Sequence, residues 1–133
     1  MEKKEKTRAL ILETDAGVAE AIEKILKRRS YAVTVATGKD EALNRLMETF
    51  HPLAVVGDPG DDVSIFEAMR KVVTTSPMTS LILVSDLPEE EVRDKSEGYG
   101  ILGHVNREVP SRDLLALVKT FESVFAPVDS LTA

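Results

Sequence analysis

Five short apolar runs alternate with five stretches of helical periodicity along the 133 residues, and this alternation constrains the fold more than any other feature. The runs predicted to be strands are Arg8–Leu12, Tyr31–Ala36, Leu53–Gly57, Ser80–Val84 and Leu102–Asn106. The predicted helices are Ala16–Arg29, Lys39–Phe50, Val63–Thr74, about Leu87–Glu97, and a last helix that opens at Pro110-Ser111, runs through Phe125 and stops at Pro127. Such alternation predicts a doubly wound α/β domain with a parallel sheet. It gives neither the strand order nor the function.

The third apolar run gives the first candidate for a functional residue. Leu53–Gly57 contains two valines and no polar side chain, and Asp58 then precedes Pro59-Gly60. A short apolar run bounded by turn residues is typical of a strand buried on both faces. Asp58 is therefore expected at the carboxyl end of a central strand, where open α/β sheets bind their ligands. The alternative is that Asp58 only caps a turn before the next helix.

Polar side chains also follow the other strands that can reach the same end of the sheet. They are Glu13, Thr14, Asp15, Ser85, Asp86 and Arg107. Carboxylates suit Mg²⁺, and a hydroxyl with a cation suits phosphoryl oxygens. Some of these residues also have structural interpretations. Asp15 or Thr14 can cap the first helix, Ser64 with Glu67 the third, and Asp86 with Glu89 the fourth. Arg107 can pair permanently with Asp58 or Glu13.

Composition excludes several classes of protein. There is no cysteine, so neither a disulfide framework nor a cysteine-ligated metal is possible. No stretch approaches the roughly 20 apolar residues of a membrane span, and the charged start does not read as a signal peptide, so we expect a cytoplasmic protein. The net charge of −6, with both signs interspersed, does not indicate a nucleic-acid-binding surface. Residues 98–103 spell G-x-G-x-x-G but precede and enter a strand, which argues against a dinucleotide loop.

Several stretches resemble the sequence pattern of bacterial response-regulator receiver domains, over about Arg8 to Phe125. They are Ala9–Leu12, Gly38–Leu43, Val55–Asp58, Leu81–Ser85 and Gly103–Arg107. The resemblance implies a flavodoxin-like (βα)5 fold, a doubly wound five-stranded parallel sheet in the order 2-1-3-4-5. Residues 8–126 would form this domain, after a charged extension at residues 1–7 and before a tail at residues 127–133.

The resemblance also implies a set of roles in two-component signalling, with no enzymatic activity of the domain's own. A histidine kinase or phosphotransfer protein would pass a phosphoryl group to Asp58. Ser85, His104 and Arg107 would contact the phosphoryl group or switch with it. Mg²⁺ would bind Glu13, Asp58 and the backbone carbonyl of Gly60, with Asp15 as a further candidate ligand. A homodimer or downstream partner would use the face of the fourth helix, fifth strand and last helix. Neither nucleic acid nor membrane is expected as a partner.

This sequence departs from the receiver pattern at four places around the expected site. Thr14 replaces the second acid, so Mg²⁺ binding is expected to be weak. Arg107 replaces the lysine and is followed by Glu108 instead of proline. The loop after Asp58 lacks the usual Met-Pro and Asp-Gly pairs, and His104 stands at the aromatic switch position. Two hypotheses therefore stay open: a receiver phosphorylated on Asp58, or a phosphorylation-independent pseudoreceiver that binds proteins. A flavin carrier is a third class.

Overall fold

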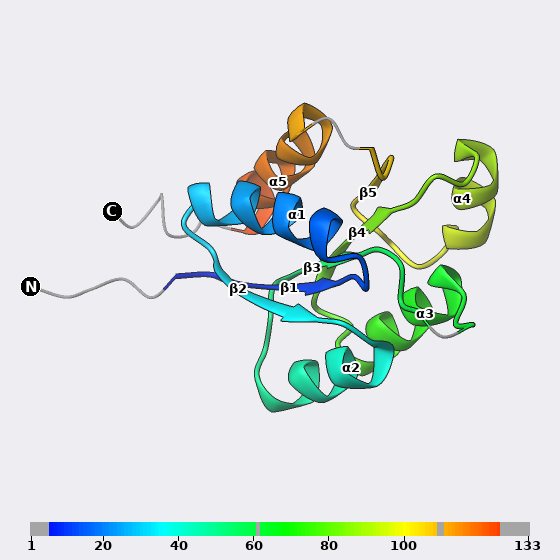
Figure 1. The fold of residues 1–133 in the computed structure, drawn as a ribbon, viewed down its shortest axis with the longest axis horizontal. Coiled ribbons are helices and arrows are strands. Elements are labelled where there is room, and N and C mark those ends of the chain that lie inside the picture. The colour runs from blue at the N-terminus through cyan, green and yellow to red at the C-terminus, as the bar shows by residue number, and fades with distance from the viewer. Residues whose placement is uncertain (1–5, 61, 109–110, 126–133) are drawn as a thin grey trace, which may run out of the picture.

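The computed structural model describes residues 6–60, 62–108 and 111–125. Its parallel sheet has the order β2-β1-β3-β4-β5, as predicted, with helices on both faces (Figure 1). The strands are β1 (Arg8–Leu12), β2 (Ala32–Ala36), β3 (Leu53–Val56), β4 (Ser80–Val84) and β5 (Gly103–Val105). The helices are α1 (Ala16–Arg28), α2 (Lys39–Glu48), α3 (Ile65–Thr75), α4 (Glu89–Ser96) and α5 (Ser111–Phe125). The predicted fold class is confirmed.

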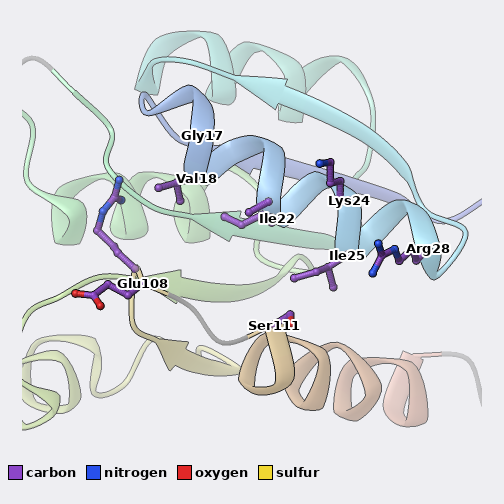
Figure 2. Close-up of a pocket in the computed structure, with 10 residues that line it drawn as sticks. Gly17, Val18, Ile22, Lys24, Ile25, Arg28, Glu108 and Ser111 are labelled. Carbon is purple, nitrogen blue, oxygen red and sulfur yellow. The ribbon is translucent and has the colours of Figure 1, made fainter.

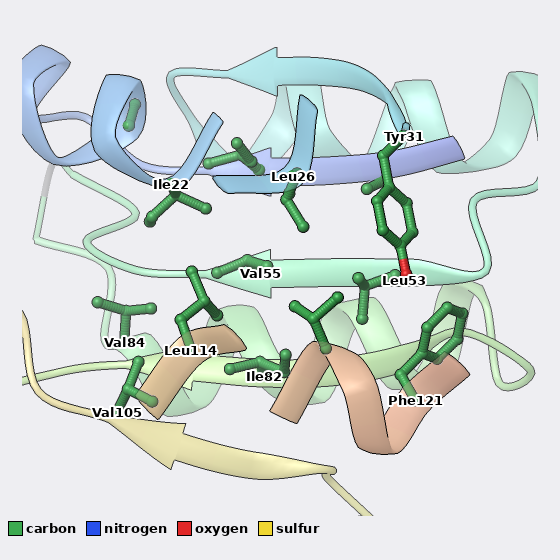
Figure 3. Close-up of a cluster of buried hydrophobic side chains, with 14 residues drawn as sticks. Ile22, Leu26, Tyr31, Leu53, Val55, Ile82, Val84, Val105, Leu114 and Phe121 are labelled. Carbon is green, nitrogen blue, oxygen red and sulfur yellow. The ribbon is translucent and has the colours of Figure 1, made fainter. Parts of the chain in front are cut away.

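Alternate residues of the central strands feed two separate apolar layers. On β1, Ala9 and Ile11 pack with the layer under α1 and α5, which Figure 3 shows. Leu10 and Leu12 pack with the opposite layer, under α2, α3 and α4. All four residues have no exposed surface. A strand covered on both faces is continuously apolar, which explains why residues 9–12 of β1 and the whole of β3 are unbroken apolar runs.

The parallel register brings the strand ends together. Leu12 is level with Val56, Val56 with Leu83, and Val84 with Val105. The loops that follow β1, β3, β4 and β5 therefore emerge at one end of the sheet. We call this the carboxyl end of the sheet, and the opposite end the amino end.

Several predicted boundaries and caps need correction. β2 begins at Ala32 because Tyr31 lies before it, buried against Phe121 with its hydroxyl donating to Glu122. The second helix stops at Glu48, since Thr49 is already extended, and β5 is shorter than predicted. The predicted tail, most of the predicted N-terminal extension, and the predicted limits of the last helix at Pro110 and Pro127 lie outside the described residues.

Two helix caps are as predicted and one is not. Asp15 accepts hydrogen bonds from two backbone N–H groups of α1, and Ser64 accepts one from Phe66. Glu67 does not complete a capping box but binds Lys39 of α2. The helix α4 has Pro88 at its N-cap without a side-chain bond, so the predicted cap there is wrong. Within the described ranges, no helix is both long and apolar enough to cross a bilayer.

Candidate functional site

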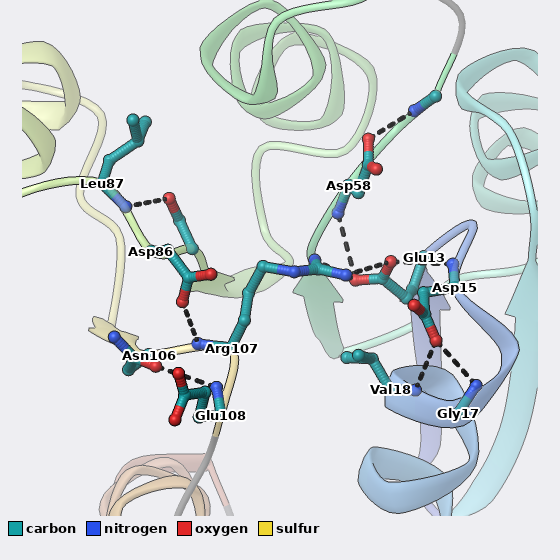
Figure 4. A network of polar contacts seen from close by, with 12 residues as sticks. Glu13, Asp15, Gly17, Val18, Asp58, Asp86, Leu87, Asn106, Arg107 and Glu108 are labelled. Carbon is teal, nitrogen blue, oxygen red and sulfur yellow. Dashed lines mark hydrogen bonds and ion pairs between the residues drawn. The ribbon is translucent and has the colours of Figure 1, made fainter.

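Glu13, the first residue after β1, is the buried centre of the carboxyl end of the sheet. Its side chain has no exposed surface. Arg107 donates from Nη1 to Oε1 at 2.6 Å and from Nη2 to Oε2 at 2.9 Å. The backbone N–H of Asp58 also donates to Oε1 at 3.1 Å, and that of Asp15 to Oε2 at 2.9 Å (Figure 4). Each carboxylate oxygen of Glu13 therefore accepts two hydrogen bonds.

This pairing raises the pKa of Arg107 and compensates the buried charge of Glu13. Bidentate contacts between guanidinium and carboxylate are among the strong, geometrically specific hydrogen bonds. The bonds to Glu13 raise the pKa of Arg107, although burial acts in the opposite direction. Arg107 keeps 21% of its side chain exposed while Glu13 keeps none. Arg107 thus covers a carboxylate that would otherwise be an unpaired buried charge.

Gly57 makes room for this ion pair. A Cβ atom at this position would lie 2.0 Å from Oε1 of Glu13 and 3.3 Å from Nη1 of Arg107. The backbone N–H of Gly57 donates to the carbonyl of Leu12 at 2.7 Å, which holds the end of β3 tightly against β1. Only glycine fits between the strand and the Glu13 carboxylate without displacing it.

Asp58 is exposed, unlike Glu13. Its Oδ1 accepts the N–H of Gly60 at 2.9 Å, so the turn-capping role considered from the sequence is present in the structure. Gly60 has φ +77°, and its Cβ would lie 2.7 Å from the methyl carbon of Thr14. Thr14 in turn donates its backbone N–H to the carbonyl of Asp58. The two loops are thereby joined at Asp58, and its carboxylate faces outward.

Ser85 and His104 form the third part of the site. Ser85 is 6% exposed, and its hydroxyl oxygen accepts the N–H of Leu87 at 3.0 Å. Its carbonyl lies 3.0 Å from Nε2 of His104, which donates in the tautomer protonated there. Asp58, Ser85 and Arg107 line one small hollow of about 190 Å³. The structure therefore brings together the residues that the sequence placed at this end of the sheet.

Arg107 also borders a larger hollow on its other side. This space of about 420 Å³ runs along α1 toward the start of α5 (Figure 2). Val18, Ile22 and Ile25 give it an apolar wall, and Lys24 lies at its rim. The arginine side chain lines both open spaces, in keeping with its partial exposure.

The predicted magnesium ligands accept hydrogen bonds from within the chain, although only Oδ1 of the exposed Asp58 carboxylate does so. Both oxygens of Glu13 bind Arg107, and Oδ1 of Asp15 accepts the N–H groups of Gly17 and Val18. The carbonyl of Gly60 accepts the N–H of Val63 at 3.0 Å. Among the described residues, no group of three or more histidine or carboxylate side chains is arranged to hold a metal. Mg²⁺ is usually bound through one or two carboxylates and several waters, and here the buried carboxylate of the set, Glu13, is paired with the cation of Arg107 instead.

The comparisons with solved structures identify the fold. Neither a protein-family model nor a curated protein matches the sequence. A CheY-like response regulator receiver domain from Methanospirillum hungatei superposes with a TM-score of 0.79 at 24% identity, covering 90% of this chain and 96% of that one. The BeF3-activated DrrB receiver domain gives 0.77 at 23% identity, with 90% and 99% covered. A response regulator from Thermotoga maritima gives 0.77 at 18% identity, with 89% and 98% covered. The chain has the fold of response-regulator receiver domains.

Proposed function

We propose that this domain is a pseudoreceiver: a protein-interaction module with the receiver fold whose binding state does not depend on phosphorylation. The bidentate bond from Arg107 to the fully buried Glu13 carries the proposal. In a receiver, the basic residue at this position is expected to form an ion pair with the phosphoryl group. Here Arg107 already forms an ion pair with the Glu13 carboxylate of the same chain.

Breaking the ion pair between Arg107 and Glu13 would cost free energy, and this cost supports a binding state that does not change. Arg107 would have to leave Glu13 to give a phosphoryl group on Asp58 the same bidentate contact. Removing one partner of a buried ion pair typically costs about 3–5 kcal/mol, because the other charge stays buried without compensation. Phosphorylation would have to supply this energy before it changed any partner-binding surface.

Phosphoryl acceptance on Asp58 is the second candidate. It is favoured by the exposure of Asp58 and by the hollow that it shares with Ser85. In that case a donor phosphohistidine would transfer its phosphoryl group to a carboxylate oxygen of Asp58, and Ser85 would donate to a phosphoryl oxygen. In this candidate, a bidentate contact from Arg107 to the phosphoryl group would replace its contact with Glu13.

A partner surface on the face of α4, β5 and α5 fits either candidate. Only Val92 and Ser96 of α4 are buried, and its exposed charges pair with one another along the helix. A helix with so few buried anchors opens at low free-energy cost, as binding surfaces commonly do. We expect a downstream protein or a second copy to bind there.

Intact mass after incubation with Mg²⁺ and acetyl phosphate separates the two candidates. We expect no added phosphoryl group on the wild type under conditions that label an ordinary receiver domain. The matched variant Thr14→Asp/Arg107→Lys, which restores the acid and the lysine, should become labelled, and adding Asp58→Ala should abolish that label. Labelling of the wild type that Asp58→Ala abolishes would overturn the pseudoreceiver proposal.

A further inference from the structure

Exposed large apolar side chains gather at the amino end of the sheet, opposite the end that carries Asp58. Of the six in the described residues, only Leu87 lies elsewhere. The other five follow or end α2, α3 and α5: they are Met47, Phe50, Met78, Val124 and Phe125. Met78, in the turn between α3 and β4, is 81% exposed. Isolated exposed apolar residues are ordinary, but a contiguous group commonly marks a binding surface.

Two adjoining hollows give this group a concave shape. One, of about 490 Å³, is lined by Phe50, Met78, Phe125 and the end of α3. The other, of about 280 Å³, is lined by the same two phenylalanines together with Lys6 and Arg8. We call the pair of hollows the amino-end groove. It is apolar where Met78 lies and basic where Lys6 and Arg8 lie.

The basic end of the groove has no internal counter-charge among the described residues. Lys6 and Arg8 are exposed, and neither forms an ion pair with a described carboxylate. This positive charge also affects the pKa of His51, the buried residue just before Pro52. Burial lowers the pKa of His51 most, and the charges of Arg8 and Arg45 lower it further. An incoming carboxylate would therefore meet an uncompensated positive potential.

We propose that the amino-end groove binds a partner protein's amphipathic segment that combines apolar anchors with acidic residues. The apolar side chains would cover Phe50, Met78 and Phe125, and a carboxylate would pair with Lys6 or Arg8. Helices that lay an apolar face into a hydrophobic groove are a recurring mode of recognition. Complementary charge would set the orientation and increase the association rate.

Two other occupants fit the groove less well. A second copy would meet it through the same surface, and the end of the groove at Met78 offers no carboxylate to the partner's Lys6 and Arg8. An anionic bilayer is opposed by the net charge of −6 and by the concave shape. The proposal is independent of the pseudoreceiver function, because it involves no residue near Asp58 and holds whether or not Asp58 accepts phosphate.

The test uses two labelled helical peptides and the full chain. Both peptides carry leucines at i, i+3 and i+4, and the flanking residues are glutamate in one and lysine in the other. We expect the glutamate peptide to bind about fivefold tighter or more, and to shift the backbone amide NMR signals of Phe50, Met78 and Phe125. Met78→Gln should weaken its binding about fivefold. Lys6→Glu/Arg8→Glu should abolish the preference between the peptides, and Leu87→Gln should change nothing.

Four outcomes would overturn the proposal. The first is equal affinity for the two peptides, or no binding of the glutamate peptide at millimolar concentration. The second is a set of shifted amides that excludes the groove. The third is binding to phosphatidylserine vesicles that Met78→Gln abolishes, which would assign the groove to a membrane. The fourth is a dimer in analytical ultracentrifugation that Met78→Gln dissociates, which would assign it to a second copy.

Discussion

At the carboxyl end of the sheet, Glu13 is fully buried and bound by Arg107, whereas at the amino end Phe50, Met78 and Lys6 face solvent. The buried charge of the first region, on Glu13, is matched by Arg107 within the chain. The apolar and basic groups of the second have no match among the described residues. The two regions share one sheet and one set of helices. Only the first pairs its central groups with one another, whereas the central groups of the second lack partners among the described residues.

This contrast shows that the fold of a domain and the place of its binding surface can vary separately. The receiver fold places polar loops at the carboxyl end of the sheet, and here hydrogen bonds around Glu13 join those loops to one another. Because a fold does not prescribe a function, recognition can reside on another surface of the same scaffold. The unmatched groups of the amino end mark such a surface.

Removing Arg107 from the carboxyl end should cause the largest loss in the free energy of unfolding. Arg107→Ala leaves the buried Glu13 carboxylate without its cation, so the free energy of unfolding should fall by about 3–5 kcal/mol. Urea denaturation measures this loss. Arg93→Ala removes an arginine from an exposed pair with Glu89 and should have little effect. A loss below about 1 kcal/mol for Arg107→Ala would show that the pair is not a structural element.

Filling the space beside Glu13 should have the next largest effect. The Cβ of Gly57→Ala would lie 2.0 Å from Oε1 of Glu13, so the carboxylate or β3 must move. We expect a loss of about 1–3 kcal/mol in unfolding free energy, as for other overpacked positions. Gly38→Ala is the matched control, since nothing lies within 4 Å of its Cβ. Equal thermal midpoints for the two variants would contradict the observed packing.

Acid should weaken the amino end through His51. Its pKa is lowered in the folded state, chiefly by burial, so the unfolded chain takes up the proton first as the pH falls. The stability from neutral His51 is complete above about pH 6.5 and is lost below it, at no more than about 1.4 kcal/mol per pH unit. Urea denaturation between pH 7.5 and 5, compared with His51→Gln, isolates this contribution. A pH dependence identical in both proteins would contradict it.

The smallest effect is expected at the most exposed apolar residue. Met78→Gln should change the unfolding free energy by no more than about 0.5 kcal/mol, because Met78 is 81% exposed. Met69→Gln is the matched control; Met69 is fully buried in the layer under α3, so the same substitution should cost several times more. If Met78→Gln were as destabilising as Met69→Gln, the amino end would be part of the core and not a free surface.

The sequence was sufficient for the fold because its periodicity is a property of single segments. The apolar run Leu53–Gly57 predicts a buried strand without reference to the rest of the chain, and the receiver resemblance supplied the strand order. Boundaries were less accurate where tertiary contacts decide. Tyr31, for example, has a strand-like side chain but is held against Phe121 and Glu122, outside β2.

The composition of the site was predictable, but its connections were not. Loop positions after the strands placed Glu13, Asp58, Ser85 and Arg107 at one end of the sheet. The sequence left Asp58 and Glu13 as equal partners for Arg107, because the choice depends on side-chain direction across 94 residues. In the sequence, Gly57 is only the last residue of an apolar run. Its neighbour in space, the Glu13 carboxylate, shows why glycine is needed there.

A calorimetric Mg²⁺ titration tests the central claim most directly, since that claim is that Arg107 has taken the place of a cation at Glu13. We predict no heat of specific binding to the wild type at low millimolar Mg²⁺, and saturable binding to Thr14→Asp/Arg107→Lys. Saturable binding to the wild type, lost in Glu13→Gln, would contradict the account.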